Sequence, residues 1–182
     1  IKEEFLKSAF AEAKITNGLG NPENWYSLIS PSEYQAFKDR VDLDFAATNP
    51  AEFNSSDAVE IDLWVKNVSQ LIVKVYEVNT QNYYRDLGRQ VNTDIQLDGL
   101  IPNYSFNFDY EDSPFLRKKR SFQFPQLEKP GVYVIDFIGN GKSSRTVVRK
   151  GQLTYVSQTT PDGHVFQVLN DRQEILRKAS LW

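Results

Sequence analysis

PGVYVIDFIGNGKSSRTVV, residues 130–148, contains two apolar runs separated by a turn signal. The first run, residues 132–137, is rich in β-branched and aromatic side chains, as strands are. Gly139, Asn140 and Gly141 supply the positive φ angles that a tight hairpin requires. Residues 145–148 then return beside the first run. The stretch therefore predicts two antiparallel strands that pair across Asn140 and Gly141.

Five more stretches have the length and pattern of strands. Apolar and polar residues alternate through most of them, as expected where one face of a sheet is buried, in residues 41–45, 59–65, 71–78, 104–110 and 121–124. Seven or so short strands joined by turns predict a mainly β fold, an antiparallel immunoglobulin-like β-sandwich. Residues 83–98 are polar and poorly patterned, and we expect a long connection there with one weak strand.

A short helical segment is predicted before the sandwich, in residues 1–40. Apolar side chains recur three and four positions apart between residues 2 and 14, which indicates one apolar stripe on a helix: Phe5, Leu6, Ala9, Phe10 and Ala13. Ser30, Pro31 and Glu33 form a strong helix start, with a capping box, and this second helix ends by Arg40. We expect Phe5, Phe10, Tyr34 and Phe37 to be buried against the sandwich or against each other.

The last part of the chain, residues 151–182, has the pattern of another hairpin. Its two strands are predicted at residues 153–157 and 164–169, and a further apolar strand is predicted to begin at Leu181 and Trp182. We interpret residues 41–150 as the β-sandwich module and 151–182 as the start of a following module. A hairpin that completes the main sandwich is the alternative. The chain begins with Ile1 rather than Met, which suggests a piece of something longer.

Composition excludes several classes of function. The chain has no Cys, so thiol nucleophiles, disulfides and Cys-based metal sites cannot form within it. Its one imidazole, His164, follows a turn and has no serine elbow to work with, which favours a strand residue over a catalytic one. The net charge of -3 and pI near 5.3 argue against nucleic-acid binding. We predict no enzyme activity, no catalytic or metal-ligating residue, no cofactor and no membrane span.

Two more motifs have simple structural interpretations. Asp109, Glu111 and Asp112 lack the spacing of a calcium loop and are expected in a solvated loop. Residues 139–144, GNGKSS, lack the spacing of a phosphate-binding loop and are better explained by the hairpin turn.

Charge is distributed unevenly along the chain. Residues 41–62 contain six acids and no base, namely Asp42, Asp44, Glu52, Asp57, Glu60 and Asp62. Four consecutive bases occur later, Arg117, Lys118, Lys119 and Arg120. On an exposed loop they would be a candidate partner-binding or protease-sensitive site, and on an edge strand they would deter pairing with other strands. The acidic and basic stretches could be two solvated faces, or could face each other. Reversing the four bases to Glu is expected to leave folding nearly intact.

Two stretches resemble modules of alpha-2-macroglobulin-like proteins, notably those of bacterial type. They are residues 65–85, which include VKNV and LIVKVYEVNT, and residues 129–145, which begin with KPGVYVIDF. The resemblance covers roughly residues 41–182 and implies a macroglobulin-like β-sandwich within a long extracellular, periplasmic or cell-surface protein. The reactive thioester of that family needs a Cys-Gly-Glu-Gln motif, which a chain without Cys cannot contain.

Together these features predict a non-catalytic structural or protein-interaction module of a large multidomain alpha-2-macroglobulin-like exported or surface protein. Its partners would be neighbouring modules of the same chain, and other proteins. The alternative is an accessory carbohydrate- or ligand-binding β-sandwich attached to an enzyme. Exposed coplanar rings at Trp25, Tyr83 and Tyr84 would favour that alternative, whereas burial of these rings would favour a plain module.

Overall fold

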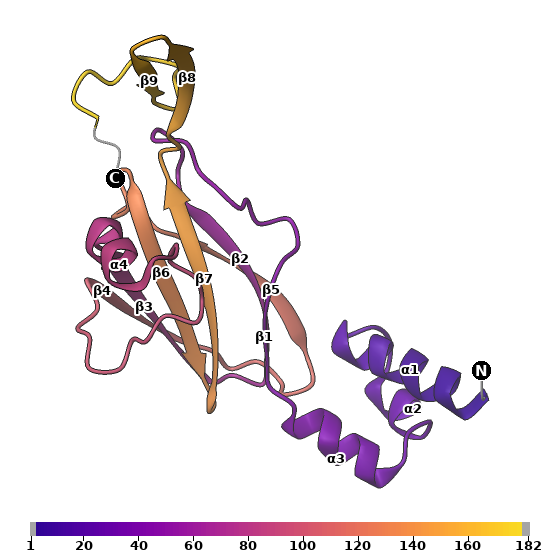
Figure 1. Cartoon of the computed structure of the whole chain (residues 1–182). Coiled ribbons are helices and arrows are strands. Elements are labelled where there is room, and N and C mark those ends of the chain that lie inside the picture. The colour runs from indigo at the N-terminus through magenta and orange to yellow at the C-terminus, as the bar shows by residue number, and fades with distance from the viewer. Residues whose placement is uncertain (1–2, 180–182) are drawn as a thin grey trace.

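The computed structural model describes residues 3–179 and contains two facing antiparallel sheets. One sheet has the strand order β1 (Asp42–Phe45), β2 (Glu60–Lys66), β5 (Arg117–Gln123). The other has the order β4 (Tyr104–Asp109), β3 (Gln70–Val78), β6 (Gly131–Gly139), β7 (Lys142–Lys150). Figure 1 shows the helical segment at one end of this sandwich and a small hairpin at the other. The predicted fold class is confirmed.

The hairpin predicted from residues 130–148 is confirmed in its register. Strands β6 and β7 pair antiparallel, with Val134 opposite Val147. Asn140 and Gly141 form the connection with φ angles of 46° and 78°, both in the left-handed region that a tight two-residue turn requires. The GNGKSS motif is therefore a strand connection.

The core lies between the two sheets and is built by alternation along the strands. Each strand of the pair β2 and β3 directs every second side chain inward, and Leu63, Leu71 and Val73 are fully buried. Phe137 on β6 is also fully buried and contacts Phe122 of β5 edge to face, with ring centroids 5.2 Å apart. This contact joins the two sheets.

Three helices form the N-terminal segment: α1 (Glu3–Thr16), α2 (Pro22–Tyr26) and α3 (Pro31–Asp39). The predicted capping box of α3 is present, because Ser30 accepts from the Glu33 N–H while Glu33 accepts from the Ser30 N–H. Helix α2 was not predicted, although Asn21 caps it and Pro22 occupies its first turn.

Burial in the helical segment differs from the prediction. Phe37 is buried and Tyr34 is partly buried, but the side chains of Phe5 and Phe10 are 66% and 52% exposed. Helix α1 instead packs through Ala11 and Ile15. The reason is that Phe115, from the loop before β5, fills the centre of the helical cluster together with Ile15 and Phe37. The broad apolar stripe of α1 consequently faces solvent.

A helix occupies part of the connection where a weak strand was expected, and that prediction was wrong. Helix α4 (Thr80–Leu87) is capped by Asn79, which accepts from the Asn82 N–H, and ends at Gly88 with φ of 64°. The chain that follows packs Val91, Ile95 and Leu97 on the outer face of the four-stranded sheet, against Tyr76 and Val134. This loop therefore covers a face that would otherwise be exposed.

The C-terminal hairpin is confirmed and forms a separate sheet from β8 (Thr154–Thr160) and β9 (Gly163–Leu169). Many of its apolar side chains are exposed, including Tyr155 at 65% and Phe166 at 46%. The apolar strand expected at Leu181 and Trp182 lies outside the described residues. Between residues 3 and 179, no helix has the length and apolar character needed to cross a membrane.

Candidate interaction surface

The four consecutive bases lie within strand β5, at the edge of the three-stranded sheet, rather than in a loop. The strand pairs Arg117 with Lys66 and Lys119 with Trp64 of β2. Because side chains alternate between the faces of a sheet, Arg117 and Lys119 share one face while Lys118 and Arg120 share the other. Cleavage by a protease would require this strand to detach from β2 first.

Arg117 and Lys119 form ion pairs with the acidic stretch. Arg117 lies 3.6 Å from a carboxylate oxygen of Asp42 and 3.0 Å from one of Asp44. Lys119 lies 2.6 Å from Asp62. Hydrogen bonds from Lys119 and then Ser121 lower the pKa of the Asp62 carboxyl below its ordinary value. Three of the six acids of residues 41–62, namely Asp42, Asp44 and Asp62, therefore face these bases.

Lys118 and Arg120 bind a different acid. Both contact Asp112, with 2.5 Å between Lys118 Nζ and the carboxylate. The guanidinium of Arg120 also lies 3.6 Å from the centre of the Tyr110 ring. A hydrogen bond from Lys118 is the largest cause that lowers the pKa of Asp112. Asp112 is thus an ion-pair partner, and no group of three or more acidic or histidine side chains between residues 3 and 179 is arranged to hold a metal.

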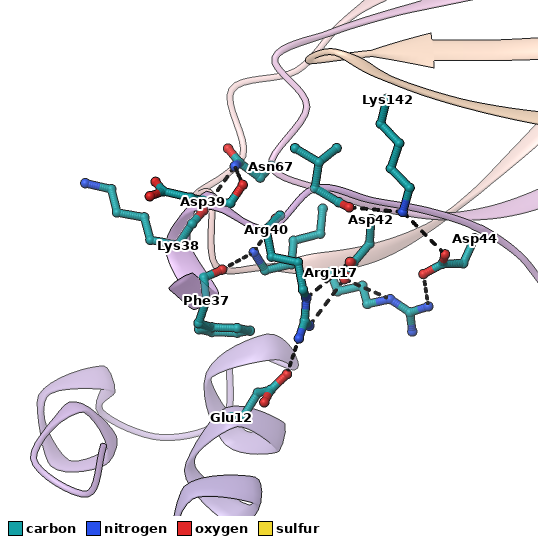
Figure 2. A network of polar contacts seen from close by, with 12 residues as sticks. Glu12, Phe37, Lys38, Asp39, Arg40, Asp42, Asp44, Asn67, Arg117 and Lys142 are labelled. Atoms are coloured by element: carbon teal, nitrogen blue, oxygen red, sulfur yellow. Dashed lines mark hydrogen bonds and ion pairs between the residues drawn. The ribbon is translucent and has the colours of Figure 1, made fainter. Parts of the chain in front are cut away.

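The same surface continues into the joint between the helices and the sandwich. Lys66 at the end of β2 is only 1% exposed, and its Nζ donates to the carbonyl oxygens of Phe37 (2.5 Å) and Arg40 (2.8 Å). The next residue, Asn67, donates to the carbonyls of Lys38 and Asp39. Figure 2 shows these bonds at the end of α3. They satisfy the carbonyls that a helix leaves unpaired at its C-terminus, where a cation is also favoured.

Arg40 completes the joint by connecting α1 to the sandwich. Its guanidinium lies 2.6 Å from Glu12 of α1 and 3.2 Å from Asp42 of β1. Asp42 also binds Arg117, and Asp44 lies between Arg117 and Lys142 (Figure 2). This chain of charges fixes the helical segment on the sandwich. Sequence reasoning missed the joint, although a lysine directly after the apolar run of residues 63–65 was a usable signal.

The rings proposed for carbohydrate recognition do not form one platform. Trp25 belongs to the helical cluster, where it contacts Phe10 at an interplanar angle of 85°. Tyr83 is partly buried in the cluster on the outer face of the four-stranded sheet, while Tyr84 is exposed. His164 lies in β9, 3.2 Å from the Thr159 hydroxyl.

A hollow of about 720 Å³ lies between α4, the following loop and the end of β3. Apolar side chains such as Leu97 and Ile101 form much of its wall. Glu77, Arg89 and Asp94 contribute charge, and the last two pair with each other at 2.6 Å.

Comparison with known proteins matches two family models to consecutive parts of the chain. Residues 71–151 match the AbpF first immunoglobulin-like domain. This range contains β3 to β7, and so both sheets of the sandwich contribute to it. The β-sandwich has an immunoglobulin-like fold. Residues 1–41 match the Actin-binding protein F N-terminal domain, and this range contains α1 to α3.

One curated protein matches the immunoglobulin-like domain together with its flanking segments. Actin-binding protein F of Dictyostelium discoideum is 38% identical over 184 aligned residues, which span all of this chain. The chain spans only 8% of the length of that relative.

Two solved structures show weaker similarity. Native alpha-2-macroglobulin from Escherichia coli, in its MG0-NIE-MG1 domains, is 13% identical over 73% of this chain and 46% of that chain, with a TM-score of 0.47. A GH9 protein of Bacteroides ovatus is 13% identical over 62% of this chain and 16% of that chain, with a TM-score of 0.27. The assignment of the immunoglobulin-like domain rests on the family match and on the sheets themselves.

These findings correct two expectations. The expected extracellular, periplasmic or cell-surface location was wrong, because it depended on an alpha-2-macroglobulin-like parent. The relative that matches along the whole chain is instead named for binding actin, a cytoskeletal protein. The immunoglobulin-like part of the prediction is confirmed. The alpha-2-macroglobulin-like parent is not, because the relative that matches along the whole chain is an actin-binding protein.

Proposed function

We propose that this chain is a non-catalytic protein-interaction module of a large multidomain actin-binding protein. The observation that carries the proposal is the order of the two family matches, an N-terminal domain followed by a first immunoglobulin-like domain, both named after actin-binding protein F. The absence of Cys and the presence of a single His also fit a role without catalysis.

The surface offered to actin is the outer face of α1. Phe5, Leu6 and Phe10 are large apolar side chains of that helix, and they are 66%, 53% and 52% exposed. Solvent-exposed apolar stripes on helices mark contact sites for other proteins. The pair between Glu12 and Arg40, together with the bonds from Lys66 to α3, holds this face in a fixed orientation on the sandwich.

Co-sedimentation with actin filaments tests the proposal directly. The chain should pellet with filaments, and Phe5→Ser with Leu6→Ser should weaken binding by about tenfold or more, because two apolar side chains lose their burial against actin. The matched control is Leu153→Ser with Tyr155→Ser, which removes two equally exposed apolar side chains from the C-terminal hairpin and should leave binding unchanged. A wild-type chain that stays in the supernatant would refute the actin partner, whereas equal binding by both double variants would refute the α1 face.

The proposal divides the chain into three parts. Residues 1–40 are a helical segment, residues 41–150 are the sandwich module, and residues 151–182 are the start of a following module. The hairpin supports the last assignment, because an isolated two-stranded sheet with exposed apolar side chains is marginally stable in water. Neighbouring modules of the same protein would cover it.

The bases of β5 serve mainly the internal ion pairs, while the half-exposed Lys118 and Lys119 provide a second contact for an acidic protein surface.

A further inference from the structure

The four edge strands of the sandwich are protected to different degrees. Strands β1 and β7 lie against each other, since Lys142 donates to the Val41 carbonyl and Ser144 to the Leu43 carbonyl. Strand β5 carries four bases, and charge on an edge deters pairing with other strands. Strand β4 has the least protection. It contains a single charged residue, Asp109, and no Lys, Arg or Pro, and no strand between residues 3 and 179 pairs with its outer side.

The outer side of β4 offers a regular row of backbone groups. Tyr110 donates its N–H to the Ser69 carbonyl of the β3 ladder. Because backbone groups alternate in direction along a strand, Phe108 and Phe106, two and four residues before Tyr110, also direct their N–H and C=O groups toward β3. Ser105, Asn107 and Asp109 therefore direct N–H and C=O groups away from the sheet. All three are exposed. The rims of Tyr104 and Phe108 are also exposed, at 40% and 36%.

The sequence of this edge is a palindrome in residue type. Residues 104–110 read YSFNFDY, so that aromatic and polar positions repeat symmetrically on either side of Asn107. If two copies pair antiparallel with the two-fold axis at Asn107, Phe106 faces Phe108, Tyr104 faces Tyr110, and Ser105 faces Asp109. Each aromatic residue then meets an aromatic residue, a favourable cross-strand combination. The one charged position, Asp109, meets Ser105 rather than another carboxylate.

We propose that the β4 edge is a self-association surface on which two copies of this chain pair antiparallel about Asn107. The pairing joins the two four-stranded sheets into one eight-stranded sheet. It satisfies the outward backbone groups of Ser105, Asn107 and Asp109, and covers the exposed rims of Tyr104 and Phe108. The interface uses the same patch on both copies, so it closes at a dimer and does not propagate.

The two-fold axis makes a charge-swap test available. Asn107→Asp and Asn107→Lys each place two like charges opposite each other, and each variant should weaken self-association by about tenfold or more. An equal mixture of the two variants should restore the dimer, because opposite charges then meet. Sedimentation equilibrium over a concentration series measures all of these states, with Asn107→Thr as the uncharged control that dimerises like the wild type. A wild-type chain that stays monomeric throughout the series overturns the proposal, as does a mixture that associates no better than its components.

Cysteine substitution tests the register in a chain that has no natural thiol. Asn107→Cys places two sulfur atoms opposite each other, at a Cα separation of about 5.5 Å that suits a disulfide. Ser105→Cys lies on the same face but does not meet its own copy. Mild oxidation should link the first variant into a dimer and leave the second unlinked, while circular dichroism confirms that both are folded. Equal cross-linking of both variants would show random collision and overturn the assigned register.

Discussion

Lys66 is an ammonium group enclosed by the fold. Burial, followed by the nearby charge of Arg40, lowers the pKa of Lys66 from 10.5 to about 8. Between these two values the unfolded chain binds a proton that the folded chain has released. Stability from this group therefore rises as the pH increases from 8 to 10.5. The group is tolerated in its charged form at lower pH because two carbonyls at the end of α3 accept its hydrogen bonds.

Replacing this lysine tests the joint at the residue scale. Lys66→Met should lower the free energy of unfolding by about 1–3 kcal/mol at pH 7, because the carbonyls of Phe37 and Arg40 lose their donor. The deficit should widen by at most about 3 kcal/mol toward pH 10, since only the wild type gains stability there. Urea unfolding at the two pH values measures both effects. A deficit that narrows with rising pH would contradict the lowered pKa.

At the scale of elements, β5 is held to its surroundings by charge as well as by its ladder with β2. Arg117 and Lys119 face Asp42, Asp44 and Asp62. The expectation that charge reversal here leaves folding nearly intact assumed solvated bases, and the observed pairs predict a measurable loss.

Arg117→Glu with Lys119→Glu should destabilise the chain by about 1–2 kcal/mol, a modest value because both bases remain partly exposed to solvent. The loss should shrink as salt is raised. Lys129→Glu with Lys178→Glu is the matched control, because it makes the same change in net charge at exposed positions without an ion pair in the described chain. Thermal unfolding at low and high salt compares the two. Equal melting temperatures for the two double variants would show that the pairs are energetically neutral.

At the scale of the whole molecule, the two ends are attached differently (Figure 1). The helical segment shares a buried cluster with Phe115 of the sandwich and covers Lys66. The hairpin forms its own sheet, and contacts that reach the sandwich include the bonds from Ser55 to Asp171. The attachment of the helical segment therefore buries apolar area, whereas the attachment of the hairpin buries much less.

Deleting either end should therefore give different results. Removal of residues 1–40 should lower the melting temperature or cause aggregation, because Phe115 becomes exposed and Lys66 loses its carbonyl partners. Removal of residues 153–182 should leave the melting temperature nearly unchanged. Calorimetry measures the melting temperatures of both truncated chains. An unchanged transition after removal of residues 1–40 would make the helical segment a linker.

Local patterns in the sequence determined the strands, the β6–β7 turn and the α3 capping box. Each of these depends on side-chain alternation or on residues a few positions apart, and so a short stretch contains all the information. The helix α4 was missed because most of its residues are polar, although its cap at Asn79, its end at Gly88 and the spacing of Tyr83 and Leu87 are local signals of the same kind.

Only the tertiary structure decided which faces meet. The apolar stripe of α1 predicts burial of Phe5 and Phe10, yet the helix contributes Ile15 to the buried cluster with Phe37 and Phe115 and leaves both phenylalanines exposed. In the same way, the sequence of the bases at residues 117–120 does not indicate that Asp42, Asp62 and Asp112 are their ion-pair partners. Composition and periodicity specify that a side chain prefers apolar or charged surroundings. The partner that supplies those surroundings is chosen by strand order and by the packing of elements far apart in the chain.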